Sequence, residues 1–124
     1  MPNPTFTKNF IAGAAIAKYR IIKFGADDEH VIQASAATDS IIGVSESLGA
    51  GTGERIDVIL SGIAEIEFSA NVNRGALITS DADGKAVQCS PVGGANNRLI
   101  GIAMAGAAAG DIAPVMISLG SIQG

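Results

Sequence analysis

The chain has 124 residues and one cysteine, Cys89, which excludes an intramolecular disulfide and a cysteine-rich zinc site. Its length suits a single domain that hides roughly 65% of the unfolded surface on folding. The formal charge is −4, but the residues before position 27 carry +4 and the remainder carries −8. This acidic body lacks the concentrated basic face with which proteins bind nucleic acid.

The apolar content of 48% does not indicate a membrane protein. Alanine supplies much of it, and no run reaches the ~18 apolar residues that a spanning helix requires. No secretory leader pattern opens the sequence. We therefore expect a soluble protein that is made in the cytoplasm and has no membrane partner.

The first twelve residues predict an extended arm. Pro2 and Pro4 disfavour both helix and regular strand. Phe6 and Phe10 are too apolar for a free tail, so we expect residues 1–12 to pack on their own chain or on a partner.

The rest of the chain alternates apolar and polar side chains in short runs, which predicts strands. Two hairpins are expected, around the acidic turn 27–29 and around the turn 81–85, where Gly84 supplies a positive φ. Ser61 and Gly62 are expected to form a turn or bulge between two strands. We expect about eight or nine short, mostly antiparallel strands and no long helix. The expected strands cover residues 17–24, 30–35, 41–45, 54–60, 64–68, 76–80, 86–89, 99–103 and 112–117.

One pattern occurs twice, in residues 41–60 and 99–117. Each copy has an Ile-Gly-apolar-small segment, a flexible spacer, a Gly-acid pair and an alternating strand. A solenoid would need three or more repeats, so the two copies predict pseudo-symmetric halves of one small β domain. We assign residues 1–12 to the arm, 13–120 to the β domain and 121–124 to a C-terminal tail.

Two motifs suggest a ligand site but fit another reading better. The Gly49-x-Gly51-x-Gly53 spacer lacks the Gly-Lys-Ser/Thr ending of a phosphate-binding loop. The Asp81-x-Asp83 pair lacks the glycine and the bidentate acid that a calcium loop requires further along the chain. We interpret the first as a β connection and the second as a hairpin turn.

Candidate catalytic residues are few. Glu65 and Glu67 would stand about 7 Å apart on one strand face, which we interpret as a solvated face. His30 is the sole imidazole and would have to serve as the base for Ser45 or Cys89. We predict no catalytic residue, no metal site and no cofactor, and we interpret Cys89 as a small packing residue.

The order of several segments resembles the capsid cement, or head decoration, proteins of tailed bacteriophages. The resemblance covers nearly the whole chain from about residue 11. The segments that carry it are Gly13–Ile16 with Tyr19-Arg20, Ala37–Val44, Asp57–Ala64, Asp81–Val87, and Ile100–Ala103 with Ala109–Asp111 and Val115.

This resemblance implies an all-β fold, a small β-barrel or "β-tulip"-like sandwich, and a structural protein rather than an enzyme. It implies a homotrimer that is made in the bacterial host cytoplasm and added to the outer surface of the capsid, where its partner is the major capsid protein. On this basis the arm is expected to contact the capsid or a neighbouring subunit, through Pro2, Pro4, Phe6, Lys8 and Phe10.

Two other functions are compatible with the same residues. The first is a homotrimeric β-barrel enzyme or ligand-binding module whose site lies where glycine-rich loops of different subunits meet. The second is a β module of the phage tail or baseplate, which has a similar small, apolar β composition.

Overall fold

The computed structural model describes residues 4–45, 47–91 and 93–123, which contain nine β-strands and no helix. The expected all-β fold with short, mostly antiparallel strands is therefore confirmed, as are both hairpins. The strands are β1 (Pro4–Ala12), β2 (Arg20–Phe24), β3 (His30–Gln33), β4 (Ile41–Ser45), β5 (Arg55–Glu67), β6 (Leu77–Ser80), β7 (Ala86–Gln88), β8 (Asn96–Ala103) and β9 (Ile112–Gln123).

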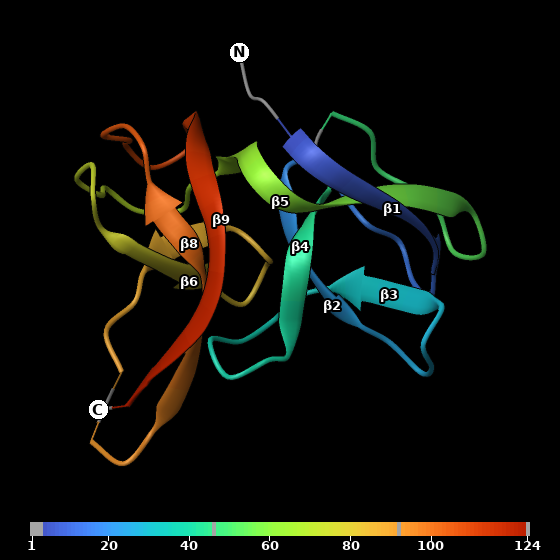
Figure 1. Cartoon of the computed structure of the whole chain (residues 1–124), viewed down its shortest axis with the longest axis horizontal. Helices are drawn as coiled ribbons and strands as arrows, with labels where there is room; N and C mark the ends of the chain where they lie inside the picture. The colour runs from blue at the N-terminus through green and yellow to red at the C-terminus, as the bar shows by residue number, and fades with distance from the viewer. Residues whose placement is uncertain (1–3, 46, 92, 124) are drawn as a thin grey trace.

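The N-terminal half closes into a five-stranded barrel, which we call barrel 1. Its strands follow the order β1-β3-β2-β4-β5, and β1 pairs again with β5 to complete the ring (Figure 1). The β1–β3 pair is parallel and the other pairs are antiparallel. The interior is filled by one aromatic ring and six aliphatic side chains, namely Phe10, Ala12, Ile16, Ile22, Val31, Ile56 and Val58.

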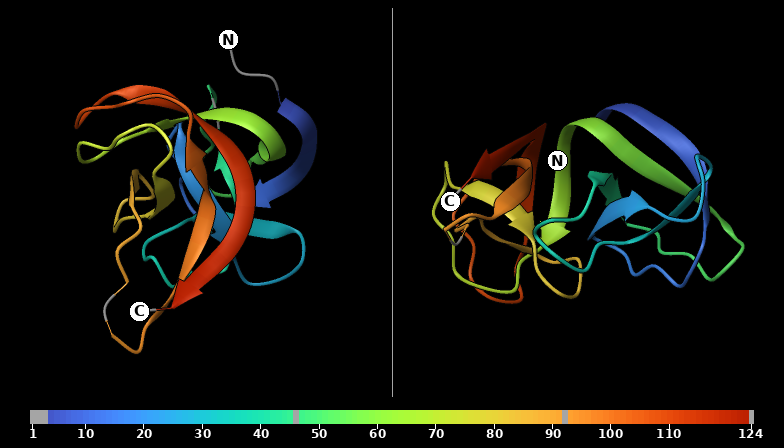
Figure 2. Two further views of the ribbon diagram at one scale, coloured as in Figure 1. Left: turned by 60° about the vertical axis from the view of Figure 1, so that its left-hand side comes forward. Right: turned by 90° about the horizontal axis from the view of Figure 1, so that it is seen from below.

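The C-terminal half forms a second set of five strands, barrel 2, beside the first (Figure 2). Strand β5 belongs to both halves: its first part pairs with β1 and its second part pairs with β9. The change of partner occurs at Gly62, which has φ 94°. The order continues as β5-β9-β8-β6-β7, and a parallel bridge between Phe68 and Ala86 joins the two ends.

Three local expectations are corrected in whole or in part. Ser61 and Gly62 do not separate two strands, because β5 runs through them as one strand of 13 residues. The expected bulge is present there, since the β1–β5 register shifts at Gly62 and at Ser61. The predicted arm is β1, a regular strand despite Pro4, because β5 and β3 both offer it a free edge. The predicted C-terminal tail is part of β9 as far as Gln123.

The doubled sequence pattern marks a duplication of the whole barrel. Val44 pairs with Ile59 in barrel 1, and Ile102 pairs with Met116 in barrel 2. Ile102 follows Val44 by 58 residues and Met116 follows Ile59 by 57, so the register is the same. Two further pairs of bridges repeat in this way: Ile16–Ala50 with Val72–Ala107, and Ala12–Val31 with Phe68–Ala86.

The glycine of each Ile-Gly pair has the same structural role. A Cβ atom on Gly43 would overlap the carbonyl oxygen of Ile59, and a Cβ atom on Gly101 would overlap that of Met116. Only glycine allows the two strands to approach this closely. The repeated glycines therefore preserve the β4–β5 and β8–β9 contacts.

The two barrels share a continuous core. Ile21, Ile41, Val44 and Ile59 project outward from barrel 1, and we call them wall 1. They are buried in one cluster with the interior residues of barrel 2. Strands β2 and β4 are consequently covered on both faces, which explains why neighbouring residues Ile21 and Ile22 are both fully buried.

A charged network reinforces the junction. Arg20 of β2 donates a hydrogen bond to Glu67 of β5 at 2.8 Å, and the Lys85 ammonium lies 3.3 Å from the other carboxylate oxygen. The hydrogen bond from Arg20 holds the pKa of Glu67 below its ordinary value of 4.5. Lys85 precedes β7, so Glu67 joins barrel 1 to the β6–β7 turn.

Tyr19 is the only non-glycine residue with a positive φ in the described part of the chain, at 61°. Gly75, which has φ 86°, follows it by 56 residues, the offset that relates Ile16 to Val72. Because this conformation costs an L-residue about 1–2 kcal/mol, we predict that Tyr19→Gly unfolds at higher denaturant concentration than Tyr19→Ala. Gly75→Ala should lower the free energy of unfolding by about 1 kcal/mol.

The matched control is Lys18, where φ is not positive. There the Lys18→Ala variant should be more stable than Lys18→Gly, which is the usual order. Chemical denaturation of the five variants measures all three comparisons. A Tyr19→Ala variant as stable as Tyr19→Gly would contradict the assignment.

The Glu67 network predicts a pH dependence of stability. Because the folded-state pKa is depressed, the stabilisation is complete above the unfolded pKa and is lost as the pH falls through the folded pKa. Glu67→Gln should lower the free energy of unfolding by about 1–2 kcal/mol at pH 7. The difference from wild type should shrink below about pH 4.5. Urea denaturation at several pH values measures this, and a difference that does not change with pH would refute it.

Candidate functional site

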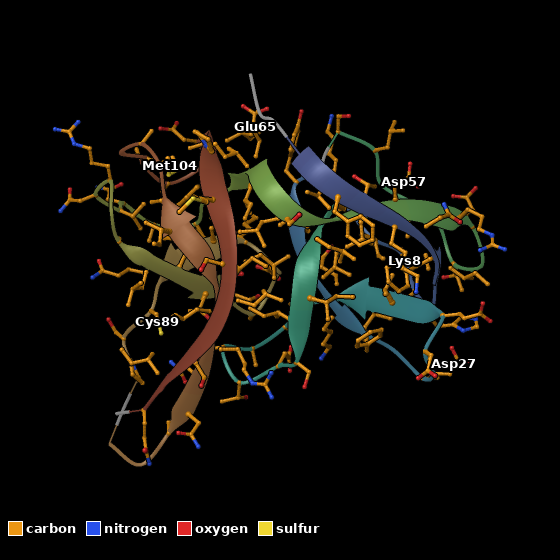
Figure 3. The ribbon with its side chains drawn as sticks, in the orientation of Figure 1. Lys8, Asp27, Asp57, Glu65, Cys89 and Met104 are labelled. Atoms are coloured by element: carbon orange, nitrogen blue, oxygen red, sulfur yellow. The ribbon has the colours of Figure 1, made fainter. Side chains whose placement is uncertain are left out.

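The predicted contact residues lie along β1, which is an integral strand of barrel 1. Pro2 lies outside the described residues, and Pro4 is the first residue of the strand. The Phe6 side chain is 56% exposed, whereas Phe10 is only 2% exposed and belongs to the interior of barrel 1. Lys8 is labelled in Figure 3, and its ammonium group lies 4.9 Å from the centre of the Phe10 ring. Phe6 and Lys8 are thus available to a partner, and the expectation that Phe10 is an anchor disagrees with its burial.

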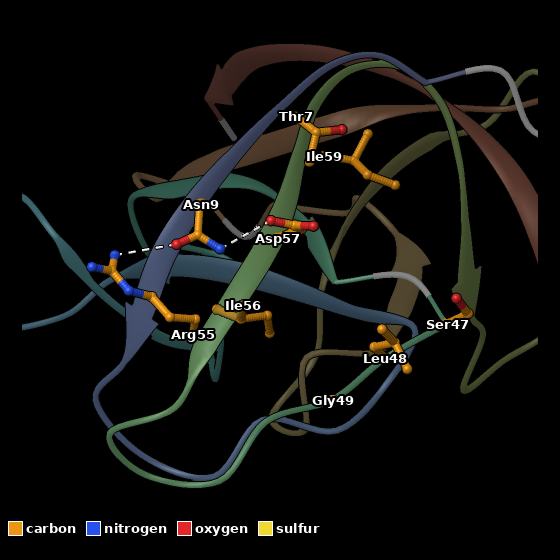
Figure 4. Close-up of a pocket in the computed structure, with 9 residues that line it drawn as sticks. All are labelled: Thr7, Asn9, Ser47, Leu48, Gly49, Arg55, Ile56, Asp57 and Ile59. Carbon is orange, nitrogen blue, oxygen red and sulfur yellow. Dashed lines mark hydrogen bonds between the residues drawn. The ribbon is translucent and has the colours of Figure 1, made fainter.

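A shallow groove of about 320 Å³ runs between β1 and the loop before β5. Its floor is polar: Arg55 donates to the Asn9 side-chain oxygen at 3.1 Å, and the Asn9 amide donates to Asp57 at 3.0 Å (Figure 4). These bonds pair a cation and an anion through one amide. Leu48, at the margin, is 78% exposed. The groove therefore combines a polar strip with the apolar side chains of Leu48, Ile56 and Ile59.

The glycine-rich spacer and the aspartate turn have structural partners. A β-bridge joins Ala50 to Ile16, and the Gly51 amide donates to the Glu54 carboxylate at 2.6 Å. Asp81 accepts hydrogen bonds from the backbone amides of Asp83 and Lys85, at 2.8 and 2.9 Å. The two motifs form a β connection and a hairpin turn, as their sequences indicated.

His30, Ser45 and Cys89 differ in burial and in their hydrogen-bond partners. The His30 ring bonds to Asp27 at 2.7 Å across the β2–β3 turn, and this bond holds the pKa of Asp27 below its ordinary value. Ser45 is fully buried and donates to the Ala17 carbonyl at 2.8 Å. Cys89 is half-buried.

The described part of the chain lacks two further features. No cluster of three or more histidine, cysteine, aspartate or glutamate side chains could hold a metal ion there. No helix of the described chain is long and apolar enough to cross a membrane.

The interpretation of Glu65 and Glu67 as a solvated pair is wrong for Glu67. That carboxylate is half-buried and bound by Arg20 and Lys85, as described above. The three residues are far apart in sequence, so no local pattern signals the network. Glu67 therefore has a structural role at the junction of the two barrels.

Sequence reasoning also missed an exposed apolar row on the outer face of barrel 2. Leu77 of β6 pairs with Ile102 of β8, and Ile102 pairs with Met116 of β9. Leu77 and Met116 are 37% and 39% exposed, and Ile102 is half-buried. Together with the half-buried Leu99 of β8 they form a surface that we call wall 2. The duplicated pattern was the available signal, because these positions match the buried residues of wall 1.

A solved structure has the same fold. The chain is similar to the head fiber gp8.5 N base of bacteriophage phi29, with a TM-score of 0.68 and 17% sequence identity. The likeness covers 91% of this chain and 93% of that one. No curated protein matches the chain.

The sequence profile of the phage cement proteins matches residues 2–118, which is nearly the whole chain. The resemblance seen in the sequence is thereby confirmed. The match includes both barrels and the β5 strand that joins them, and it ends within β9. The chain belongs to the phage cement protein family and is a structural protein of the phage capsid.

Proposed function

We propose that this protein binds the outside of the assembled phage capsid and holds neighbouring capsid subunits together. The observation that carries the proposal is the family match over residues 2–118. Its partner is the major capsid protein, and it is made in the host cytoplasm before it joins the virion. We also propose that it acts as a homotrimer.

The stabilising effect follows from linkage. A ligand that binds the assembled lattice and not the separated subunits shifts the equilibrium toward the lattice by mass action. Each copy needs only a modest interface, because the contact recurs over the whole shell. An outer location lets the protein be added after assembly without entering the packed interior.

The exposed side of β1 is the surface that best fits this contact. Phe6 of β1 and Leu48 at the margin of the groove are large, exposed apolar residues, and the groove itself carries the polar strip formed by Arg55, Asn9 and Asp57. Apolar anchors beside satisfied polar groups are typical of protein interfaces.

A point substitution is the right test, because removing residues 2–10 would remove β1 and open barrel 1. We predict that Phe6→Glu weakens binding to expanded, empty capsids at least tenfold, equivalent to about 1.4 kcal/mol. Co-sedimentation over a range of protein concentrations measures the affinity. The thermal half-life of the decorated capsids reports stabilisation.

Leu119→Glu is the matched control, since Leu119 is comparably exposed but lies on β9 of barrel 2. It should bind as wild type does. Wild-type affinity for Phe6→Glu would exclude the β1 surface, and failure of the wild-type protein to sediment with capsids would exclude the function itself.

A further inference from the structure

We infer that copies of this chain dock head to tail, with wall 2 of one copy covering the open end of barrel 1 of the next. The inference specifies how the proposed self-association occurs. It rests on the internal duplication and can be tested without capsids, so it can fail independently of capsid binding.

The chain contains an internal precedent for this contact. Wall 1 is buried against barrel 2, with every member at most 5% exposed. Strand β4 of wall 1 touches β8 and β9 of barrel 2 directly. The duplication gives each residue of wall 1 an equivalent in wall 2. The pairs are Ile21 with Leu77, Ile41 with Leu99, Val44 with Ile102, and Ile59 with Met116.

The equivalent wall of barrel 2 stays apolar but lacks a cover. All four members of wall 2 are apolar residues that are half-buried or exposed. A soluble surface under no other constraint would carry polar side chains at most of these positions. An exposed apolar row of this kind is characteristic of an interaction site.

The second surface is the part of barrel 1 that corresponds to the covered end of barrel 2. In barrel 2, Ala64, Ser80 and Ile100 are almost fully buried, and Ile117 packs against the shared core. Their equivalents in barrel 1 are Lys8, Phe24, Ile42 and Leu60, which we call the barrel-1 end.

This end is open in the single chain. Phe24 is 45% exposed, although its equivalent Ser80 is buried. Ile42 and Leu60 are half-buried against the interior of barrel 1. The Phe24 ring stands edge-on to Phe10 at 6.1 Å, and Lys8 lies over the same Phe10 ring. Phe24 and Lys8 thus cover the buried Phe10 at this end of barrel 1.

A second copy is the occupant that fits both surfaces. Wall 2 is the equivalent of wall 1, and the barrel-1 end is the equivalent of the covered end of barrel 2. Each chain therefore carries one open copy of both surfaces that it joins internally. Repeat units that cannot bury an apolar face alone bury it against the next unit. Because Lys8 replaces Ala64, the contact between copies is less apolar than the internal one, which makes it the weaker of the two.

A contact between two different surfaces is heterologous, so it builds a closed ring where the rotation permits and an open chain where it does not. This property distinguishes it from a two-fold dimer, in which each surface would meet its own copy. A variant that has lost either surface should therefore fail to self-associate. Two variants that have lost different surfaces should still bind each other when they are mixed.

The test uses the full chain in the absence of capsids. Light scattering with size-exclusion chromatography, from about 5 µM to about 500 µM, should show wild-type oligomers growing with concentration, since this range brackets weak interfaces. Met116→Glu places a negative charge in wall 2, and Phe24→Glu places one in the barrel-1 end. Each should weaken self-association at least tenfold. An equimolar mixture of the two variants should give a 1:1 heterodimer and nothing larger.

Leu48→Glu is the matched control, because Leu48 is the most exposed of the large apolar residues described and lies on neither surface. It should assemble like wild type. Leu77→Lys provides a second wall 2 variant should Met116→Glu be unstable, as judged by thermal denaturation.

A wild-type protein that stays monomeric throughout this range would overturn the inference, as would Met116→Glu and Leu77→Lys variants that assemble normally. Variants that fail alone and also fail when mixed would overturn the head-to-tail arrangement. If wall 2 instead binds the capsid, wild type will be monomeric and Met116→Glu will lose capsid binding, which also contradicts self-association.

Discussion

Burial of wall 1 against barrel 2 is the contact on which the rest of the structure depends. A barrel built from one repeat alone would be close to the size at which a hydrophobic core becomes marginal. Sharing β5 and fusing the outer surface of one barrel with the interior of the other gives the two halves a common core. It also buries β2 and β4 on both faces, so the Ile21-Ile22 and Ile41-Ile42 doublets are both used in packing.

Much of this arrangement was readable in local patterns. Alternation predicted most strands and both hairpins, and the repeated Ile-Gly pair correctly predicted two similar halves. Local patterns did not predict barrel closure, which was expected only from the family resemblance. Closure depends on β1, whose Pro4 argued against a strand and whose partner β5 is distant in sequence. The same holds for Glu67: its solvated appearance follows from local alternation, and its true environment depends on Arg20 and Lys85.

The site was the harder part, because this protein works through surfaces. The residues that resemble chemical motifs, such as Asp81 and Ser45, are bound to backbone groups and support turns and strand ends. Of the predicted contact residues, Phe6 is exposed and Phe10 is not, although residues four apart on a strand share a face. The difference depends on which part of β1 covers the barrel interior, and that is a property of the closed barrel. Wall 2 is recognisable only from the different exposure of equivalent residues in the two barrels.

A reconstruction of the decorated phage head at a resolution that resolves strands tests the account most directly. We predict density for this chain on the outer surface of the capsid, with β1 toward the shell and wall 2 of each copy covered by the barrel-1 end of its neighbour. Density on the inner surface, or copies whose Met116 faces solvent while the capsid is fully occupied, would contradict it.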